Sequence, residues 1–258
     1  MSAVATAFDV TAAPHERVPC NLCGTTPTAI VATKDRYGLP TRIVQCVQCG
    51  LRFINPRMTA ESYAAFYRDG YRPLVKTLYA QMGQPYSLRT IEQSQWEYAR
   101  ELAGEVGRFL PAGGTLLDVG GSTGIVGRAF RKQWGFDVTV LDPSPEELAR
   151  ATGCRTICGS AETAELPPVD VALLCRTMDH LLDPLAVLRR LRQCARLLIV
   201  DSRDADAWPA GSRYQVDHPY AFSARTLAAM VRRAGWAIQH TWTRRTGKYV
   251  GLVCSPQE

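Results

Sequence analysis

The sequence predicts an α/β domain built on a mostly parallel sheet with helices on both faces, preceded by a small cysteine-rich module. Two observations predict this arrangement. From Thr115 onward, short apolar runs alternate with helical segments, which is typical of parallel strands joined by covering helices. Between Val18 and about Arg57, two Cys-x-x-Cys pairs stand in a stretch rich in Gly, Pro and Thr that offers little core of its own.

We divide the chain into four predicted parts: a loose polar arm over 1–17, the cysteine-rich module over 18–57, a helical connecting layer over 58–110 and the sheet domain over 111–258. Short alternations in the module, Ala29–Ala32 and Arg42–Val44, are typical of small hairpins. In the connecting layer, apolar residues recur at three- and four-residue steps and predict one apolar helix face: Ile91, Tyr98, Leu102, Val106 and Phe109.

Seven strands are predicted in the sheet domain: Thr115–Val119, Asp137–Leu141, Arg155–Ile157, Val169–Leu174, Leu197–Asp201, Trp236–Trp242 and Lys248–Cys254. Helices are predicted near 124–133, 145–151, 184–194 and 223–234. A polar turn joins the last two strands, so we expect them to pair antiparallel at the edge of the sheet.

Composition limits the class of protein. The net charge of +6 comes from Lys and Arg interspersed with acids, which gives weak support for an anionic substrate and does not require a nucleic-acid partner. No apolar run approaches the ~18 residues of a membrane span, and the start lacks a signal-peptide pattern. Nine cysteines, an odd number, fit a reducing, cytoplasmic compartment better than a disulfide framework. The sequence does not predict an oligomeric state.

The two tight cysteine pairs predict a metal site. Cys20-x-x-Cys23 and Cys46-x-x-Cys49, each followed by Gly, supply the four thiolates that hold Zn²⁺ tetrahedrally at ~2.3 Å. Because all four positions are cysteine and none is left for water, the zinc is predicted to be structural. Spare reduced thiols or two redox pairs are the alternative interpretation. The other cysteines are predicted to be small core residues: Cys154, Cys158, Cys175, Cys194 and Cys254.

A glycine-rich turn follows the first predicted strand of the sheet domain and contains Gly120, Gly121 and Gly124. Such glycines let the backbone turn sharply and approach a ligand closely. Asp142 ends the next strand, 22 positions after Gly120, near the ~20-residue spacing of an acid that accepts hydrogen bonds from ribose hydroxyls. Nucleotide-type ligand binding is the leading interpretation, and a purely structural turn is the alternative.

Asp118, at the mouth of this turn, favours S-adenosylmethionine (SAM) over a dinucleotide. A carboxylate there repels a pyrophosphate, whereas SAM has no phosphate and carries an ammonium and a sulfonium. The loop also lacks the full Gly-x-Gly-x-x-Gly pattern.

Over about residues 90–258 the chain resembles class I SAM-dependent methyltransferases. The resemblance rests on the Asp118-x-Gly120-x-x-x-Gly124 loop, on Asp142, on Gly159-Ser160-Ala161-Glu162 and on a helix that begins Asp183-Pro184. It implies a Rossmann-like fold in which the loop holds the methionine part of SAM and Asp142 holds the ribose. The adenine is then expected beside Ser160, Ala161 and Glu162. Ser122 stands where many members have Gly.

The N-terminal part looks like the zinc-binding module of some bacterial sugar methyltransferases, on the evidence of Cys46–Arg57 (CVQCGLRFINPR), Phe66-Tyr67 and Tyr71. Those enzymes act on nucleotide-linked 4-keto sugars and carry a further C-terminal domain, which the resemblance does not include. We therefore expect a sugar or nucleotide-sugar as the acceptor, and methylation at a carbon or at a hydroxyl both stay open.

Catalytic residues are expected after the strand Val169–Leu174, because ligands lie beyond the carboxyl ends of parallel strands. His180 is the predicted general base, and Asp179 is predicted to orient it or to bind substrate. The resemblance supports this choice, because related sugar enzymes have a Glu-His pair at the matching place. His218 is a weaker candidate for the acceptor pocket. The alternatives are a structural histidine at His180, which caps the next helix or satisfies a backbone group, and a merely exposed loop histidine at His218.

Tyr67 and Tyr71 are predicted to cover the pocket or, alternatively, to pack as core residues. Two other functions stay open for the whole chain. One is an RNA methyltransferase that uses the zinc module to hold RNA, although the module has few basic residues. The other is a non-catalytic binding protein that keeps the SAM fold as a scaffold.

Overall fold

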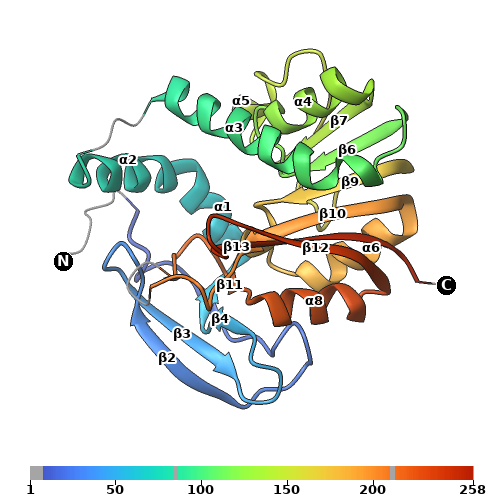
Figure 1. Ribbon diagram of the computed structural model, residues 1–258. Helices are drawn as coiled ribbons and strands as arrows, with labels where there is room; N and C mark the ends of the chain where they lie inside the picture. The colour runs from blue at the N-terminus through green and yellow to red at the C-terminus, as the bar shows by residue number, and fades with distance from the viewer. Residues whose placement is uncertain (1–7, 84–86, 210–212, 258) are drawn as a thin grey trace.

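The structure is a computed structural model that describes residues 8–83, 87–209 and 213–257 (Figure 1). Its centre is a seven-stranded sheet with the order β12-β13-β10-β9-β6-β7-β8, which confirms the predicted fold class. The strands are β6 (Thr115–Val119), β7 (Asp137–Asp142), β8 (Arg155–Cys158), β9 (Val169–Cys175), β10 (Ala195–Arg203), β12 (Trp236–Arg244) and β13 (Tyr249–Pro256). Neighbours from β8 to β10 are parallel, and β13 runs antiparallel to both β10 and β12.

Helices cover both faces of this sheet. On one face lie α3 (Leu88–Val106), η1 (Gly107–Phe109), α4 (Ile125–Trp134) and α5 (Pro145–Leu148), and on the other α6 (Pro184–Cys194) and α8 (Ala224–Arg233). Alternate strand residues supply the two cores: Leu116 faces α3 and α4, whereas Leu117 faces α6 and α8. The carboxyl ends of the parallel strands are left for the loops between these layers, including η2 (Met178–His180).

The cysteine-rich module forms an antiparallel sheet that the C-terminal half of the chain completes. β2 (Thr28–Lys34), β3 (Pro40–Cys46) and β4 (Arg52–Ile54) are joined by β11 (Tyr220–Ala221), which pairs with β4. Cys46, Leu51 and Phe53 belong to the same apolar core as α6 and α8. The module is therefore packed onto the sheet domain and shares its core.

Residues 8–17 pack against the rest of the chain, whereas the sequence predicts a loose arm over 1–17. β1 (His15–Glu16) pairs antiparallel with β5 (Arg57–Met58). Val10 is buried, and Phe8 packs edge-on against Phe66 at 5.7 Å between ring centroids. These apolar side chains gain burial by docking, which a solvated arm would not offer. Residues 1–7 lie outside the described residues.

The connecting layer is helical, with α1 (Ala60–Asp69) and α2 (Tyr71–Gln81) ahead of α3. The Thr59 side chain caps α1 by accepting from the Ser62 amide. In Figure 1, α1 and α2 lie between the N-terminal sheet and the sheet domain. No helix among the described residues combines the length and apolar character that a membrane crossing requires.

Candidate active site

The glycine-rich turn between β6 and α4 is held in left-handed backbone conformations. Gly120, Ser122 and Gly124 have φ angles of 68°, 52° and 69°. Ser122 adopts the conformation that glycine takes at the lowest cost, and two bonds hold it there. Its amide donates to Asp142 Oδ2 at 2.9 Å, and its hydroxyl donates to Glu147 at 2.8 Å. The loop thus keeps its turn although a serine stands where a glycine is common.

Asp118 lies beneath this loop. Its carboxylate is 3% exposed and accepts a hydrogen bond at 3.0 Å from the amide of Gly127, in the first turn of α4. Burial raises the pKa of Asp118 to about 7, and the nearby Asp142 adds to this effect. The structure therefore gives the predicted acid a partner within the chain, where it ties the loop to α4.

The other predicted cofactor-binding residues lie along the same carboxyl edge, since Val119 is paired with Leu141 and Asp142 with Cys158. Asp142, at the end of β7, accepts from the Ser122 and Ser144 amides, both at 2.9 Å. Burial raises the pKa of Asp142, and these two amides oppose that rise. Over the same end of the loop, Arg72 of α2 forms an ion pair with Glu147 of α5.

The segment after β8 is fixed by its own hydrogen bonds. The Ser160 hydroxyl donates to the Glu162 carboxylate, whose other oxygen accepts from the Leu182 amide at 2.9 Å. Ala161 is buried between them. The structure thus brings the predicted adenine segment to the edge that also carries the glycine loop and Asp142.

His180 is held by a tyrosine from α1. The Tyr67 hydroxyl lies 2.8 Å from His180 Nδ1 and 2.9 Å from the Asp217 carbonyl oxygen. A carbonyl only accepts, so the hydroxyl proton points to Asp217 and the tyrosine oxygen accepts from Nδ1–H. Burial raises the pKa of Tyr67 well above its ordinary value, which keeps the hydroxyl protonated. This contact therefore favours the His180 tautomer that has its proton on Nδ1 and its lone pair on Nε2.

A second histidine and two carboxylates surround His180. His218 packs edge-on against the His180 ring at 4.4 Å between centroids. Asp179 Oδ2 lies 3.1 Å from His218 Nδ1, and Asp217 Oδ2 lies 3.4 Å from its Nε2. Asp179 thus contacts His218 directly, not its neighbour His180. A nitrogen of each histidine and an Asp217 oxygen lie within 4.8 Å of one another.

Electrostatics in this cluster follow from burial and from the short spacings. Burial lowers the pKa of His218, whereas Asp179 and Asp217 act in the opposite direction. Burial also works against ionisation of Asp179, but His218 and then His180 outweigh it and lower the pKa of that carboxyl. Asp179 is therefore a carboxylate that fixes the orientation of His218.

A pocket adjoins this cluster, between the N-terminal sheet and the carboxyl end of β10. Its lining includes Asp179, Arg203, Trp208, Tyr214, Gln215 and His218. The rest of the lining is mostly apolar or aromatic, including Ile43, Phe53 and Phe222, so a few polar and charged groups stand in a mainly apolar pocket, as in many small-molecule sites.

Several residues of this region were not singled out from the sequence. Asp217 immediately precedes His218, and Tyr67 was predicted only as a cover or a packing residue. Asp201, at the carboxyl end of β10, accepts from the Arg176 amide at 2.8 Å and from Arg244 at 2.8 Å. An acid at the end of a predicted parallel strand was a signal that could have identified Asp201.

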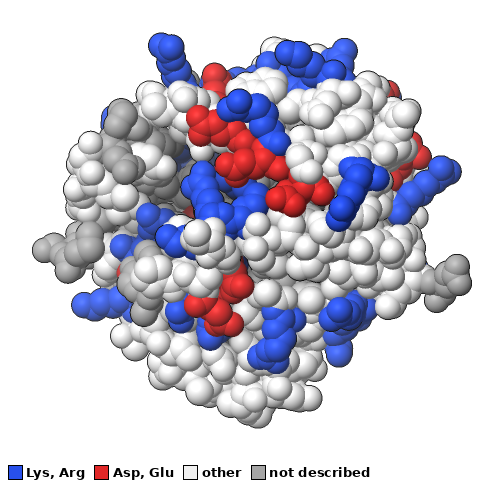
Figure 2. Space-filling view, viewed as in Figure 1, with Lys and Arg blue, Asp and Glu red and all other residues white. Residues whose placement is uncertain are grey.

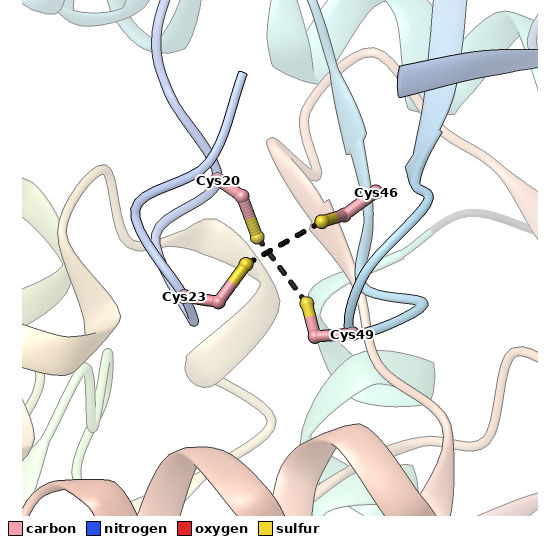
Figure 3. Close-up of side chains that lie close together, drawn as sticks. All are labelled: Cys20, Cys23, Cys46 and Cys49. Carbon is pink, nitrogen blue, oxygen red and sulfur yellow. Dashed lines mark hydrogen bonds between the residues drawn. The ribbon is translucent and has the colours of Figure 1, made fainter. Parts of the chain in front are cut away.

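The four cysteines of the module converge on one point (Figure 3). The Sγ atoms of Cys20 and Cys49 lie 3.4 Å apart, as do those of Cys23 and Cys46, and all four lie within 4.8 Å of one another. Tetrahedral Zn–S bonds of ~2.3 Å place sulfur atoms about 3.8 Å apart, so the donor set and spacing fit Zn²⁺. Next to this cluster, Asn21 accepts from the Leu185 amide at 3.0 Å and so contacts the start of α6.

Comparisons with known proteins agree with this architecture. A family model described as a methyltransferase domain matches residues 92–241. No curated protein sequence matches the chain. The chain is similar to a solved structure from Haloferax volcanii, the complex of the Trm112 methyltransferase activator with a methyltransferase. The TM-score is 0.56 at 16% identity, and the match covers 66% of this chain and 93% of that one.

Two further structures show how widely the fold is used. CalO1, a methyltransferase of calicheamicin biosynthesis in its SAH-bound form, matches at a TM-score of 0.54 and 20% identity, over 75% of this chain and 60% of that one. The [4+2]-cyclase SpnF matches at 0.54 and 16% identity, over 64% and 82%. These likenesses show the fold, and the family match covers more than half of the sequence. The chain therefore belongs to the methyltransferase-domain family and is a SAM-dependent methyltransferase.

Proposed function

We propose that this enzyme methylates a small-molecule acceptor, a sugar or a nucleotide-sugar, with His180 as the general base. The observation that carries the proposal is the Tyr67 contact, which leaves the Nε2 lone pair of His180 for a proton. His180 follows β9 at the carboxyl edge of the sheet, beside the glycine loop, where the acceptor of a Rossmann-like enzyme is expected.

SAM fits the edge formed by β6, β7 and β8. The left-handed glycine loop supports close approach of the methionine part, and Asp142 keeps a second lone pair on each oxygen for the ribose hydroxyls. Ser160, Ala161 and Glu162 would border the adenine. Asp118 acts from beneath by holding the loop against α4.

The reaction then needs positioning and one proton transfer. When bound, SAM supplies an electrophilic methyl group on its sulfonium. The acceptor oxygen or carbon would bond to that methyl group as the methyl–sulfur bond breaks and leaves a neutral thioether, S-adenosylhomocysteine (SAH), while the acceptor proton would pass to His180 Nε2. Tyr67 keeps Nδ1 protonated throughout, so the resulting imidazolium has a hydrogen-bond partner. His218, fixed by Asp179, borders the acceptor pocket.

We also propose that the four cysteines hold one structural zinc. All donors of this cluster are protein thiols, so that no ligand position is left for water or substrate. Its effect would be to fix the two Cys-x-x-Cys turns and, through Asn21, the start of α6.

Methyl transfer tests the proposal directly. Purified protein would be incubated with methyl-labelled SAM and a panel of nucleotide-linked sugars in keto and hydroxyl forms, as wild type and as His180→Gln. His240→Gln is the matched control, because His240 stacks on Phe109 away from the cluster. We expect label in a sugar product, lost in His180→Gln and retained in His240→Gln. Label lost equally in both variants would remove His180 as the base.

The same assay separates the other functions. Label that enters RNA but no sugar, with affinity that falls steeply with salt, would indicate an RNA methyltransferase. Tight SAM binding without transfer to any acceptor would indicate a scaffold.

A further inference from the structure

Arginine and aromatic side chains are stacked along the carboxyl ends of β9 and β10. The Arg176 guanidinium lies 4.0 Å from the Tyr98 ring centroid and 5.8 Å from that of Tyr249. Tyr249 packs edge-on against Trp208 at 5.9 Å, and Arg203 lies 3.9 Å above the Trp208 ring. We call these five residues the arginine–aromatic array. One end of the array, Arg203 and Trp208, lines the acceptor pocket.

Charged side chains of both signs lie near this array. Figure 2 shows Lys and Arg side chains, bordered by Asp and Glu, in the middle of the face on which Figure 1 places the turn between β12 and β13. Two of the carboxylates are paired with an arginine: Asp201 and Glu101 lie 2.8 and 2.9 Å from the Arg244 guanidinium. Asp201 also accepts from the Tyr98 hydroxyl and the Arg176 amide.

Arg176 is stacked on tyrosines without an ion-pair partner. Across residues 8–83, 87–209 and 213–257, no carboxylate forms an ion pair with its guanidinium, and its buried Nε, like that of Arg244, has no hydrogen-bond partner. A partly buried guanidinium normally pairs with an acid, because removing charge from water is costly. Cation–π contacts with two tyrosines replace only part of that interaction.

The backbone at Arg176 adds a separate observation. Its φ angle is +55°, in the left-handed region that a long side chain rarely adopts. The Asp201 carboxylate, 2.8 Å from the Arg176 amide, holds this conformation. Strain of this kind persists where the surrounding structure imposes it and is concentrated at binding and catalytic sites. Here it turns the side chain away from the strand direction and onto Tyr98.

We infer that Arg176 binds an oxyanion group of the acceptor, a phosphate or a carboxylate, at the end of the array next to the methyl-transfer site. This inference rests on the proposed function, because His180 lies four positions after Arg176 and the intervening Thr177 donates to the Val119 carbonyl at the start of the glycine loop. A planar guanidinium recognises such a group through two parallel hydrogen bonds. The diphosphate of a nucleotide-sugar has this chemistry.

Anion binding to the SAH-saturated full-length protein tests the inference. Inorganic pyrophosphate and malonate would be titrated separately by calorimetry, so that a phosphate preference is distinguished from a carboxylate preference. The variants are Arg176→Met and, as a matched control, Arg245→Met, because Arg245 also lies within 6 Å of Tyr249 (5.9 Å) but on the exposed turn.

We expect Arg176→Met to weaken binding of the preferred anion about ten-fold or more, as for loss of a charged hydrogen-bond partner, and Arg245→Met to weaken it less than about three-fold. If Arg176→Met does not fold, Arg176→Lys takes its place, with an expected loss of about three-fold because the charge stays and the planar fork is lost. Wild type that binds neither anion, or equal losses in the Arg176 and Arg245 variants, would overturn the inference. Failure of SAH itself to bind would instead overturn the proposed function.

Discussion

Replacing Tyr67 with phenylalanine isolates the contact that sets the protonation form of His180. The substitution removes one oxygen and keeps the ring that packs against Phe66 and Tyr71. Two hydrogen bonds disappear, at 2.8 Å to His180 Nδ1 and at 2.9 Å to the Asp217 carbonyl. His180 is then free to carry its proton on Nε2, where it cannot act as a base.

The expected size of the effect follows from these two bonds. A buried group that loses its partner costs ~1–3 kcal/mol, and each ~1.4 kcal/mol changes an equilibrium ten-fold. The preference for the Nδ1–H form should therefore fall by about ten-fold or more, and kcat/KM for methyl transfer by about the same factor. SAH affinity should stay within about two-fold, because Tyr67 makes no hydrogen bond to the glycine loop.

Tyr63→Phe is the matched control. Tyr63 lies one turn earlier on α1, is buried, and donates to the Val216 carbonyl at 3.3 Å without touching a histidine. Nitrogen-15 NMR of labelled histidine reports the His180 tautomer without an acceptor, and methyl-transfer kinetics report the rate. The reasoning fails if Tyr67→Phe leaves the Nδ1–H form dominant, or if both variants slow the reaction equally.

Three further predictions concern the loop and the metal. The pKa of Asp118 is raised from 3.8 to about 7, so this carboxyl keeps its proton to a higher pH in the folded state than in the unfolded chain. Asp118 therefore lowers the free energy of unfolding progressively as the pH rises from ~4 to ~7. Asp118→Asn should be more stable than wild type by up to ~4 kcal/mol at pH 8 and not at pH 4, measured by urea unfolding; a pH-independent difference would contradict this. Gly120→Ala should abolish SAH binding and lower the free energy of unfolding by ~1–3 kcal/mol, because the added methyl group meets the Thr177 hydroxyl at 2.5 Å. Gly247→Ala, also at positive φ but with no atom within 4 Å of the added methyl group, should keep SAH binding. Cys46→Ser should lose the proposed zinc, measured by atomic absorption, and should lower the melting temperature of the whole chain, because Cys46 lies in the main core. Cys158 is exposed, so Cys158→Ser should change neither the zinc content nor the melting temperature.

The sheet domain was predictable because its pattern is local. The predicted strands, three to six residues long and separated by helical segments, fall within β6 to β10, and the polar turn before Tyr249 predicted the antiparallel pair β12 and β13. The prediction of a loose arm over 1–17 was wrong for residues 8–17. Val10 and Phe8 pack against side chains far along the chain, and no local pattern indicates such contacts. The addition of β11 to β4 is also a pairing across a long sequence separation, and a strand of two residues carries no periodic signal.

In the candidate site too, contacts between residues far apart in the sequence were not predicted. Asp142 and the glycines follow adjacent strands, so their meeting at one edge follows from the order of the elements. The sequence predicted that Asp179 orients His180 or binds substrate, and the first of these roles does not match the observed contact, because adjacent residues in a short helical turn point in different directions. Asp179 meets His218, and Tyr67 meets His180 from 113 positions away. Such contacts depend on how α1 and the segment before β11 are packed, which no local motif specifies.

The candidate site is built from two parts of the chain. The groups proposed for SAM lie on loops of the sheet domain itself, whereas the orientation of His180 depends on the N-terminal part. Tyr67 lies on α1, which follows β5 directly, and Arg57 of β5 donates to the Leu182 carbonyl and to the Tyr220 hydroxyl. Asp217 belongs to the segment that continues into β11 on the module's sheet. The proposed cofactor site and the contacts of His180 are therefore carried by different parts of the chain, and the cysteine-rich module adjoins the segments before α1 and after Asp217 that bring Tyr67 and Asp217 to His180.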